Sequence, residues 1–298
     1  MILLTGATGF VGSALLKALL EAGYEVGCVK RKTSDCSRVK SVMQECAWYD
    51  VEDVERAFDT NLVEAVIHCA TDYGRNECEV ASVYRSNVMF PLDLLDLAMR
   101  HGCQWFVNTD TFFVRQIDCL WQDTKKLYMD SYTKTKYIFT HIVRDHIQTS
   151  SLAFINMQME HIYGAGDGDK KFVSYLLDQL QKNVDQLELT EGLQMRDWIY
   201  LKDVLSAYLI VLQKRDRFQP GNFYQFEVGT GKETTLRNFV EQAKEITHSS
   251  TQLLFGKRKM QENELMRSCA DNQKLCDLGW KAEYHIEDGI REMIEGGI

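Results

Sequence analysis

The stretch Thr5-Gly6-Ala7-Thr8-Gly9-Phe10-Val11-Gly12 decides the fold of this chain. The apolar run Ile2-Leu3-Leu4 precedes it, as a buried strand would, and an apolar face at helical spacing follows it, formed by Val11, Ala14, Leu15, Ala18 and Leu19. Glycines in such a turn let the chain bend tightly, admit a pyrophosphate against the backbone and bring the helix close to the strand. A glycine turn without a ligand is the alternative, but this strand–turn–helix order predicts a dinucleotide site at Gly6, Thr8, Gly9, Phe10, Val11 and Gly12.

Short apolar runs alternate with helical patterns through the N-terminal half. We expect strands at residues 24–29, 65–69, 105–108 and 152–156, and helices at residues 53–58, 83–101 and 132–146. Pro91 predicts a kink near the middle of the helix over 83–101. Strands and helices in this order, joined by right-handed crossovers, predict an α/β fold with a doubly wound parallel Rossmann sheet.

The pattern loosens after residue 163. We expect residues 1–160 to form a dinucleotide-binding domain, with residues 194–230 partly returning to it. Residues 161–193 and 231–298 then form a smaller, discontinuous α+β substrate domain. Within this half the patterns predict helices at 172–182, 203–214 and 286–294 and a strand at 223–228.

Composition excludes several classes of function. Basic residues number 34 against 43 acidic ones, and the net charge of −9 disfavours binding to nucleic acid or to an anionic membrane. No stretch approaches the roughly 18 apolar residues of a membrane helix, and no signal peptide is expected. The nine cysteines are irregularly spaced, which favours reduced thiols in a cytoplasmic protein, and the scattered histidines give no metal site.

The turn Lys30-Arg31-Lys32-Thr33-Ser34 bears on the choice of cofactor. An NAD site usually carries an acidic residue here to bind the ribose hydroxyls, and this turn has none. The planar guanidinium of Arg31 suits a 2′-phosphate, with Lys32 and Ser34 assisting. The turn therefore predicts NADPH/NADP, with a merely solvated basic turn as the alternative.

Tyr132 and Lys136 are four residues apart, so a helix places both on one face. A tyrosine with its ordinary pKa of about 10 is a poor acid or base at neutral pH. A nearby ammonium group stabilises the phenolate and lowers that pKa. The pair predicts hydride chemistry with Tyr132 as the acid–base group, against the alternative of an ordinary surface helix.

With these motifs the sequence resembles the extended short-chain dehydrogenase/reductases, the NAD-dependent epimerase/dehydratase family. The resemblance implies that Asp50-Val51 touches adenine, that Ala70, Thr71 and Asn108 lie beside the cofactor, and that Asn87 props the active site. It also places the catalytic hydroxyl on Thr109 and a diphosphate-binding arginine at Arg196. We further count Met159 among the cofactor residues.

A closer resemblance is to the enzymes that make CDP-abequose and CDP-paratose. It rests on Ile67-His68-Cys69-Ala70-Thr71-Asp72-Tyr73-Gly74, Asn108-Thr109-Asp110-Thr111-Phe112-Phe113 and the stretch from Glu160 to Gly168. It implies NADPH-dependent reduction of the 4-keto group of a CDP-linked (3,6-di)deoxyhexose, on the way to the O-antigen of lipopolysaccharide. The expected substrate contacts are Tyr73, Asp110, Thr111, His161, Lys171, Arg196 and Arg267.

Two rival functions stay open. An epimerase of the same family would hold NAD(H) tightly without consuming it, and a cofactor-sensing protein would bind NADP without catalysis. A dehydratase of this family would need a second acid where Thr111 stands. We also expect a homodimer paired through the helices over 83–101 and 132–146, with a monomer as the alternative.

Overall fold

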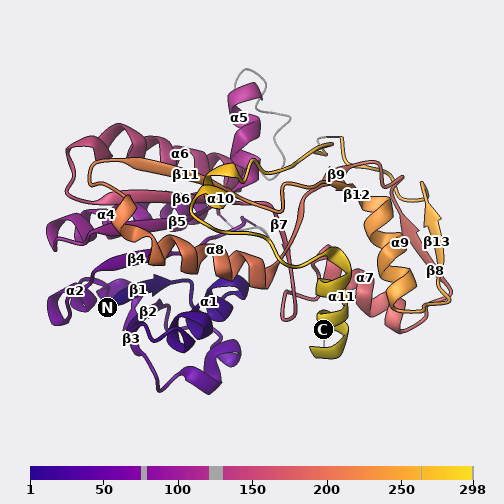
Figure 1. The fold of residues 1–298 in the computed structure, drawn as a ribbon, viewed down its shortest axis with the longest axis horizontal. Coiled ribbons are helices and arrows are strands. Elements are labelled where there is room, and N and C mark those ends of the chain that lie inside the picture. Colours follow the sequence, from indigo (N-terminus) through magenta and orange to yellow (C-terminus); the bar gives the residue numbers. More distant parts are fainter. Residues whose placement is uncertain (75–78, 121–129, 263, 297–298) are drawn as a thin grey trace. The chain divides into compact units, whose positions relative to one another are not determined.

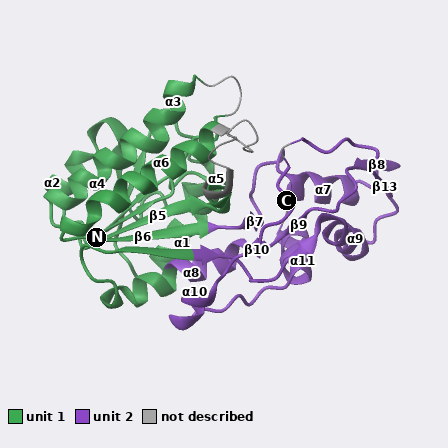
Figure 2. Ribbon diagram, turned by 90° about the horizontal axis from the view of Figure 1, so that it is seen from above, with its two compact units in different colours: residues 1–158, 209–226 green, residues 159–208, 227–298 purple. Residues whose placement is uncertain are grey.

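The computed structural model describes residues 1–74, 79–120, 130–262 and 264–296. The chain divides into two compact units (Figure 2). Unit 1 comprises residues 1–158 and 209–226, and unit 2 comprises residues 159–208 and 227–298. Each unit is therefore built from segments that are far apart in the sequence.

A seven-stranded sheet forms the centre of unit 1 (Figure 1). Its strands, in the order β11-β6-β5-β4-β1-β2-β3 across the sheet, are β11 (Phe223–Val228), β6 (Ala153–Met159), β5 (Trp105–Thr111), β4 (Ala65–His68), β1 (Ile2–Thr5), β2 (Val26–Lys30) and β3 (Ala47–Asp50). In parallel register, Ile2 lies beside Val26 on one side and Ala65 on the other. The direction of the strand order reverses between β1 and β4, so the predicted doubly wound parallel sheet is confirmed.

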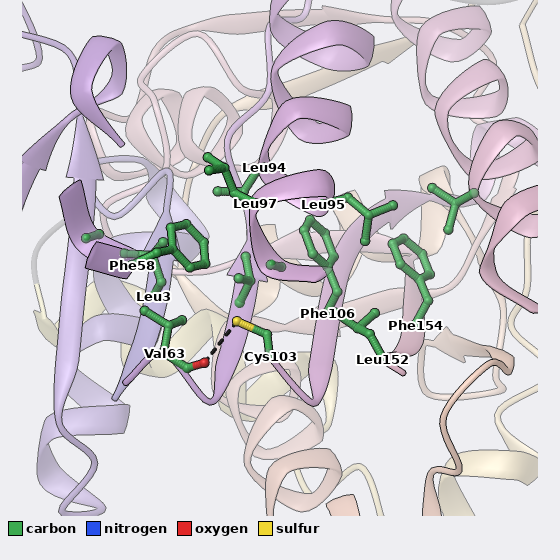
Figure 3. Close-up of a cluster of buried hydrophobic side chains, with 14 of the residues drawn as sticks. Leu3, Phe58, Val63, Leu94, Leu95, Leu97, Cys103, Phe106, Leu152 and Phe154 are labelled. Atoms are coloured by element: carbon green, nitrogen blue, oxygen red, sulfur yellow. Dashed lines mark hydrogen bonds between the residues drawn. The ribbon is translucent and has the colours of Figure 1, made fainter. Parts of the chain in front are cut away.

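The helices of unit 1 are α1 (Phe10–Glu21), α2 (Glu55–Thr60), α3 (Val80–Tyr84), α4 (Phe90–Arg100), α5 (Arg115–Leu120) and α6 (Asp130–His146). One face of the sheet packs against α2, α4 and α6 through a buried cluster that includes Leu3, Phe106 and Phe154 (Figure 3). The rings of Phe106 and Phe154 stack 5.3 Å apart. Burying one such side chain contributes about 1.5–3 kcal/mol, so this face anchors α6 firmly against the strands.

The helical region before α4 contains an irregularity close to the expected kink. A π-helical turn, η3 (Arg85–Met89), connects α3 to α4, and Pro91 lies in the first turn of α4. Proline has no N–H to donate to the carbonyl four residues earlier, and its ring crowds that carbonyl. The wider π turn before Pro91 accommodates this, so the distortion lies on the N-terminal side of the proline rather than at it.

Two features of the sheet differ from the sequence expectation. The edge strand β3 was not expected, because it is short, begins exposed and ends in a carboxylate. Strand β5 continues to Thr111 instead of ending at residue 108. Its polar end stays in the buried ladder because side-chain hydrogen bonds satisfy it, as described below.

Unit 2 is a mixed α+β unit with three two-stranded sheets. These pair β7 (His161–Tyr163) with β10 (Trp198–Tyr200), β9 (Met195–Arg196) with β12 (Thr234–Thr235), and β8 (Gln186–Leu189) with β13 (Gln252–Phe255). Its helices are α7 (Phe172–Gln181), α8 (Leu201–Gln213, which continues into unit 1), α9 (Leu236–Ile246), α10 (Gln273–Asp277) and α11 (Ile286–Gly296). Trp198 and Phe239, with ring centroids 4.3 Å apart, lie in its core. Among the described residues, no helix is both long enough and apolar enough to cross a bilayer.

Candidate active site

The glycine loop between β1 and α1 is packed so closely that a side chain would not fit. Gly6 has a φ of +71°, and a Cβ there would lie 2.6 Å from the backbone nitrogen of Ala70. A Cβ on Gly12 would lie 2.1 Å from the carbonyl oxygen of Gly6. Gly9 begins α1 without a side-chain cap, and its N–H donates to Gly6 O at 2.9 Å. The uncapped helix N-terminus and the close backbone packing fit a pyrophosphate.

The ends of β1 and β4 are joined where the strand order reverses. Thr5 Oγ1 lies 2.8 Å from Nδ1 of His68 and accepts a hydrogen bond from the N–H of Ala70 at 3.3 Å. His68 is fully buried, and burial, with a smaller contribution from the positive charge of Lys136, holds its pKa well below the ordinary value. The imidazole is therefore neutral. Crevices at such a reversal are the usual place for a dinucleotide in this sheet type.

The basic turn after β2 meets the acidic end of β3. Lys32 Nζ lies 3.1 Å from a Glu52 oxygen and 3.9 Å from an Asp50 oxygen, and the hydrogen bond to Glu52 raises the pKa of Lys32. Ser34 Oγ accepts a hydrogen bond from the N–H of Arg31 at 3.1 Å. The guanidinium of Arg31 is exposed and has no ion pair among the described residues. The structure thus brings Arg31, Lys32, Ser34 and Asp50 together, with Val51 starting the next turn.

Lys136 on α6 reaches the end of β5. Its Nζ donates to the carbonyl oxygen of Thr109 at 2.9 Å, and the side chain is buried. The Thr109 hydroxyl donates to Cys69 Sγ at 3.2 Å. Burial lowers the pKa of Lys136, while the charge of Asp110 raises it. Tyr132, one helical turn before Lys136, is also buried, and its ring lies 4.9 Å from that of Tyr73.

A buried polar chain crosses the ends of β5, β6 and β11. Asn108 Nδ2 donates to Asn156, Asn156 Nδ2 donates to Asp110 at 2.8 Å, and Gln158 Nε2 donates to the same Asp110 oxygen at 3.5 Å. The backbone N–H of Thr111 donates to the other oxygen at 2.8 Å. Burial raises the pKa of Asp110, and these donors oppose that rise.

The chain continues from Gln158 to the surface. Gln225 Nε2 donates to Gln158 at 3.0 Å, and Arg144 donates to Gln225 at 2.9 Å. Sequence reasoning assigned no role to Asn156 or Gln158. The sequence does contain a signal for them. Asn156 and Gln158 are two residues apart, as are Asn108 and Asp110 on the neighbouring strand. Residues with this spacing lie on one face of a strand, so both pairs meet.

Asn87 braces the loop after β4 against α6. Its Nδ2 donates to Asp72 O at 2.7 Å and to Thr135 Oγ1 at 3.0 Å. Its Oδ1 accepts from the N–H of Asp72 at 2.8 Å and from the Thr71 hydroxyl at 3.3 Å. The amide is therefore fully used in positioning Thr71 and the start of α6.

Arg196 and Arg267 of unit 2 are both paired with carboxylates. Arg196 is buried and donates from Nη2 to Glu264 at 2.5 Å and from Nη1 to Met195 O at 2.9 Å. Arg267 is exposed and lies 2.7 Å from Glu233. Met195, the neighbour of Arg196, also forms an isolated β-bridge with Arg267. Unit 2 therefore brings the backbones of Arg196 and Arg267 close together.

The other expected residues of unit 2 lie on different segments. His161 Nδ1 lies 3.6 Å from the buried carboxylate of Glu160, and its ring contacts Trp198, its partner in the β7–β10 register. Lys171 is the residue from which α7 starts. Met159 is buried at the end of β6.

Comparisons with known proteins agree with this geometry. Residues 2–229 match the profile of the NAD dependent epimerase/dehydratase family. A CDP-abequose synthase from Salmonella muenchen is 35% identical over 98% of this chain and 96% of that enzyme, and one from Salmonella typhimurium is 33% identical over 99% and 97%. Among solved structures, UDP-glucose 4-epimerase from Thermotoga maritima with UDP-glucose superimposes with a TM-score of 0.82 at 21% identity, over 99% of this chain and 97% of that one. The latter likeness supports the fold.

Proposed function

Since the chain belongs to the NAD dependent epimerase/dehydratase family, we propose that it is an NADPH-dependent 4-ketoreductase acting on a CDP-linked (3,6-di)deoxy-4-hexulose. More broadly, it is a nucleotide-sugar-modifying enzyme of that family. One observation carries the proposal. Lys136 Nζ donates a hydrogen bond to Thr109 O, and this contact holds α6, which carries Tyr132, against the strand end that carries Thr109.

The cofactor site proposed here fits a phosphorylated dinucleotide. Gly6, Gly9 and Gly12 allow the loop to pack closely at the uncapped N-terminus of α1, which would bind a pyrophosphate, and the exposed Arg31 suits a 2′-phosphate. The remaining proposed contacts with the cofactor are made by Asp50, Val51, Ala70, Thr71, Asn108, Lys136 and Met159. When bound, NADPH supplies the hydride for ketone reduction.

The chain's own residues handle the proton and the developing charge. Tyr132 donates its proton to the carbonyl oxygen of the substrate, and the Thr109 hydroxyl donates a hydrogen bond to the same oxygen. Lys136 stabilises the tyrosinate that remains. Donors placed in advance at a growing oxyanion lower a barrier by about 3 kcal/mol each.

The substrate proposal rests on the relatives and on the cations of unit 2. The two Salmonella relatives are named CDP-abequose synthases, which motivates a CDP-linked sugar and a place in O-antigen assembly. Arg196, with Arg267, Lys171 and His161, would bind the diphosphate. Tyr73, Asp110 and Thr111 would lie toward the sugar, although the Asp110 carboxylate already accepts three hydrogen bonds.

The decisive experiment is turnover. The protein is incubated with NADPH and a panel of 4-keto nucleotide sugars carrying CDP, UDP, dTDP or GDP, and the absorbance of reduced cofactor is followed. We expect consumption with the CDP-linked sugar and a 4-hydroxy product by NMR. No consumption with any member of the panel would overturn the proposal.

The cofactor preference has its own test. Arg31→Ala should raise the KM for NADPH by about 10-fold or more while leaving that for NADH unchanged, because a charge-assisted bond contributes roughly 1.5–3 kcal/mol. Lys40→Ala, at another exposed basic residue, serves as the control. Equal KM values for the two cofactors in the unaltered protein would contradict the preference.

An NAD-holding epimerase is the second candidate, and one observation favours it. Lys32 is engaged by Asp50 and Glu52, which places carboxylates near the basic turn. Acidic residues in this region suit unphosphorylated ribose hydroxyls. Interconversion of two nucleotide sugars without net use of cofactor would identify this activity.

The expected homodimer and the cytoplasmic location remain proposals. Val80 and Met89, at either end of the segment leading into α4, are 61% and 52% exposed, and a partner subunit bound at this segment would cover them. Light scattering coupled to size-exclusion chromatography measures the molar mass in solution. We expect the mass of two chains, and the mass of one chain would contradict the dimer.

A further inference from the structure

Two thiols face each other between the second and third strands of unit 1. Cys28 lies on β2, and Cys46 directly precedes β3. Their sulfur atoms are 3.9 Å apart, with the Cys28 thiol donating to Cys46. Cys28 is fully buried and Cys46 is partly exposed. A reagent from solvent can therefore meet Cys46 first, with Cys28 in place behind it.

We propose that Cys28 and Cys46 form a reversible disulfide when the protein meets a peroxide, and that this bond controls the basic turn that lies between them in the sequence. Cys28 lies on β2 and Cys46 directly before the neighbouring parallel strand β3, in which Ala47 pairs with Gly27 and Trp48 with Cys28. A disulfide needs its sulfurs about 2.05 Å apart, so the thiols must approach by roughly 2 Å.

The surroundings permit that approach. Strand β3 is the edge strand of the sheet, and its first residue is exposed. Cys46 precedes the first paired residue of that strand and contacts Val42 O only at 3.8 Å. An edge residue outside the ladder can shift without breaking strand hydrogen bonds, whereas Cys28 is held inside the sheet.

The oxidation balances with hydrogen peroxide as the oxidant. The Cys46 sulfur, as thiolate, attacks one peroxide oxygen, so that an S–O bond forms, the O–O bond breaks and hydroxide leaves. The Cys28 sulfur then attacks the resulting sulfenic sulfur, forming the S–S bond, and its proton leaves with the displaced hydroxide as water. Two thiols and one peroxide give one disulfide and two waters.

The electrostatics favour Cys46 as the attacking thiol. The hydrogen bond from the Cys28 thiol lowers the pKa of Cys46, whereas that hydrogen bond and burial raise the pKa of Cys28. The thiolate is the nucleophilic form of cysteine. The partly exposed residue is therefore also the one that ionises more readily.

The bond would enclose the turn that carries Arg31, Lys32 and Ser34. Lys30, at the start of this turn, pairs in register with Asp50 at the end of β3. Drawing Cys46 toward β2 moves the beginning of β3, and through it the Asp50 and Glu52 carboxylates that hold Lys32. The consequence for NADPH rests on the proposed function, but the disulfide itself does not.

Peptide mapping tests the bond. The reduced full-length chain is treated with hydrogen peroxide, remaining thiols are alkylated, and the digest is analysed by mass spectrometry without reductant. We expect a peptide linking Cys28 to Cys46, lost on adding dithiothreitol and absent in Cys46→Ser. The matched controls Cys36→Ser and Cys276→Ser should retain it. Absence of the linked peptide, or oxidation of Cys46 to sulfinic acid alone, would overturn the proposal.

Binding tests the control of the turn. The NADPH dissociation constant is measured for the reduced and oxidised chain and for Cys46→Ser after the same treatment. We expect a change of at least severalfold in the wild type and none in the variant. A linked peptide with unchanged affinity would overturn control of the turn. Reduced protein that binds no dinucleotide would instead contradict the proposed function, and the peptide map would still decide the disulfide.

Discussion

The charged groups near α6 and those of unit 2 are neutralised in different ways. In unit 1, Lys136 and Asp110 are both 3% exposed, and they interact electrostatically inside a buried hydrogen-bonded chain. In unit 2, the carboxylate partners of Arg196 and Arg267 remain partly open, with Glu264 at 22% and Glu233 at 16% side-chain exposure.

This difference indicates two kinds of role. A buried charge pair is a fixed part of its site, because breaking it leaves an uncompensated charge at a cost of about 3–5 kcal/mol. A carboxylate that water can reach is an exchangeable partner, and a phosphate can take its place on an arginine at little cost. We therefore expect changes at the buried groups near α6 to act on kcat and changes at the arginines of unit 2 to act on the KM for the nucleotide sugar.

The largest expected effect is that of Tyr132→Phe. Removal of the phenol removes the proton donor, and kcat should fall by about 10³-fold while KM changes little, since general acids contribute 10²–10⁴-fold. Steady-state kinetics on the reductase reaction measure this. Tyr137→Phe, on the same helix and in ring contact with His141, is the control and should retain activity. Near-normal kcat in Tyr132→Phe would remove Tyr132 from the mechanism.

Arg196→Gln should raise the KM for the nucleotide sugar by about 100-fold with kcat within a few-fold of normal, because a fork on phosphate oxygens contributes roughly 2–3 kcal/mol. Arg237→Gln, at a half-exposed arginine of α9, is the matched control. Arg196→Lys should recover only part of the affinity, because it keeps the charge and loses the fork. A fall in kcat alone would show that Arg196 acts like the buried groups near α6, and would contradict the expected difference between the two units.

Asp110→Asn should shift the pH dependence of kcat. The Asp110 charge raises the pKa of Lys136 against the lowering by burial, so without that charge Lys136 loses its proton at a lower pH. The alkaline limb of the profile should therefore move to lower pH. Asp96→Asn, on the exposed side of α4, should leave the profile unchanged. An alkaline limb that stays in place would contradict the coupling of Asp110 to Lys136.

The smallest expected effect is that of Glu264→Gln. Loss of the carboxylate removes a competitor of phosphate on Arg196, and the affinity for CDP should rise by about 3-fold, which corresponds to roughly 0.7 kcal/mol. Titration calorimetry measures this without any turnover. Glu262→Gln, two residues earlier, is the control. Weaker binding would show that Glu264 supports Arg196 instead of competing for it.

Local signals in the sequence were sufficient for most of unit 1. Each of these signals spans only a few consecutive residues. They are the turn from Gly6 to Gly12, the alternation of apolar strands with amphipathic helices, and the spacing of Tyr132 and Lys136 on one helix. The sheet was predicted correctly for this reason. Strand β3 was missed because an edge strand has only one neighbour and carries little apolar pattern.

Three-dimensional contacts decided the rest. Three contacts join residues that lie 20 to 46 positions apart in the chain. They are those of Lys136 with Thr109 O, Asp110 with Asn156 and Lys32 with Glu52. Folding likewise brings Glu264 to Arg196, 68 residues away, and Cys28 to Cys46. The sequence by itself determined the fold class and the glycine loop, because backbone and burial preferences are local. Only the tertiary structure decided which charges are neutralised and by what, because the energy of a charge depends on neighbours that folding brings together.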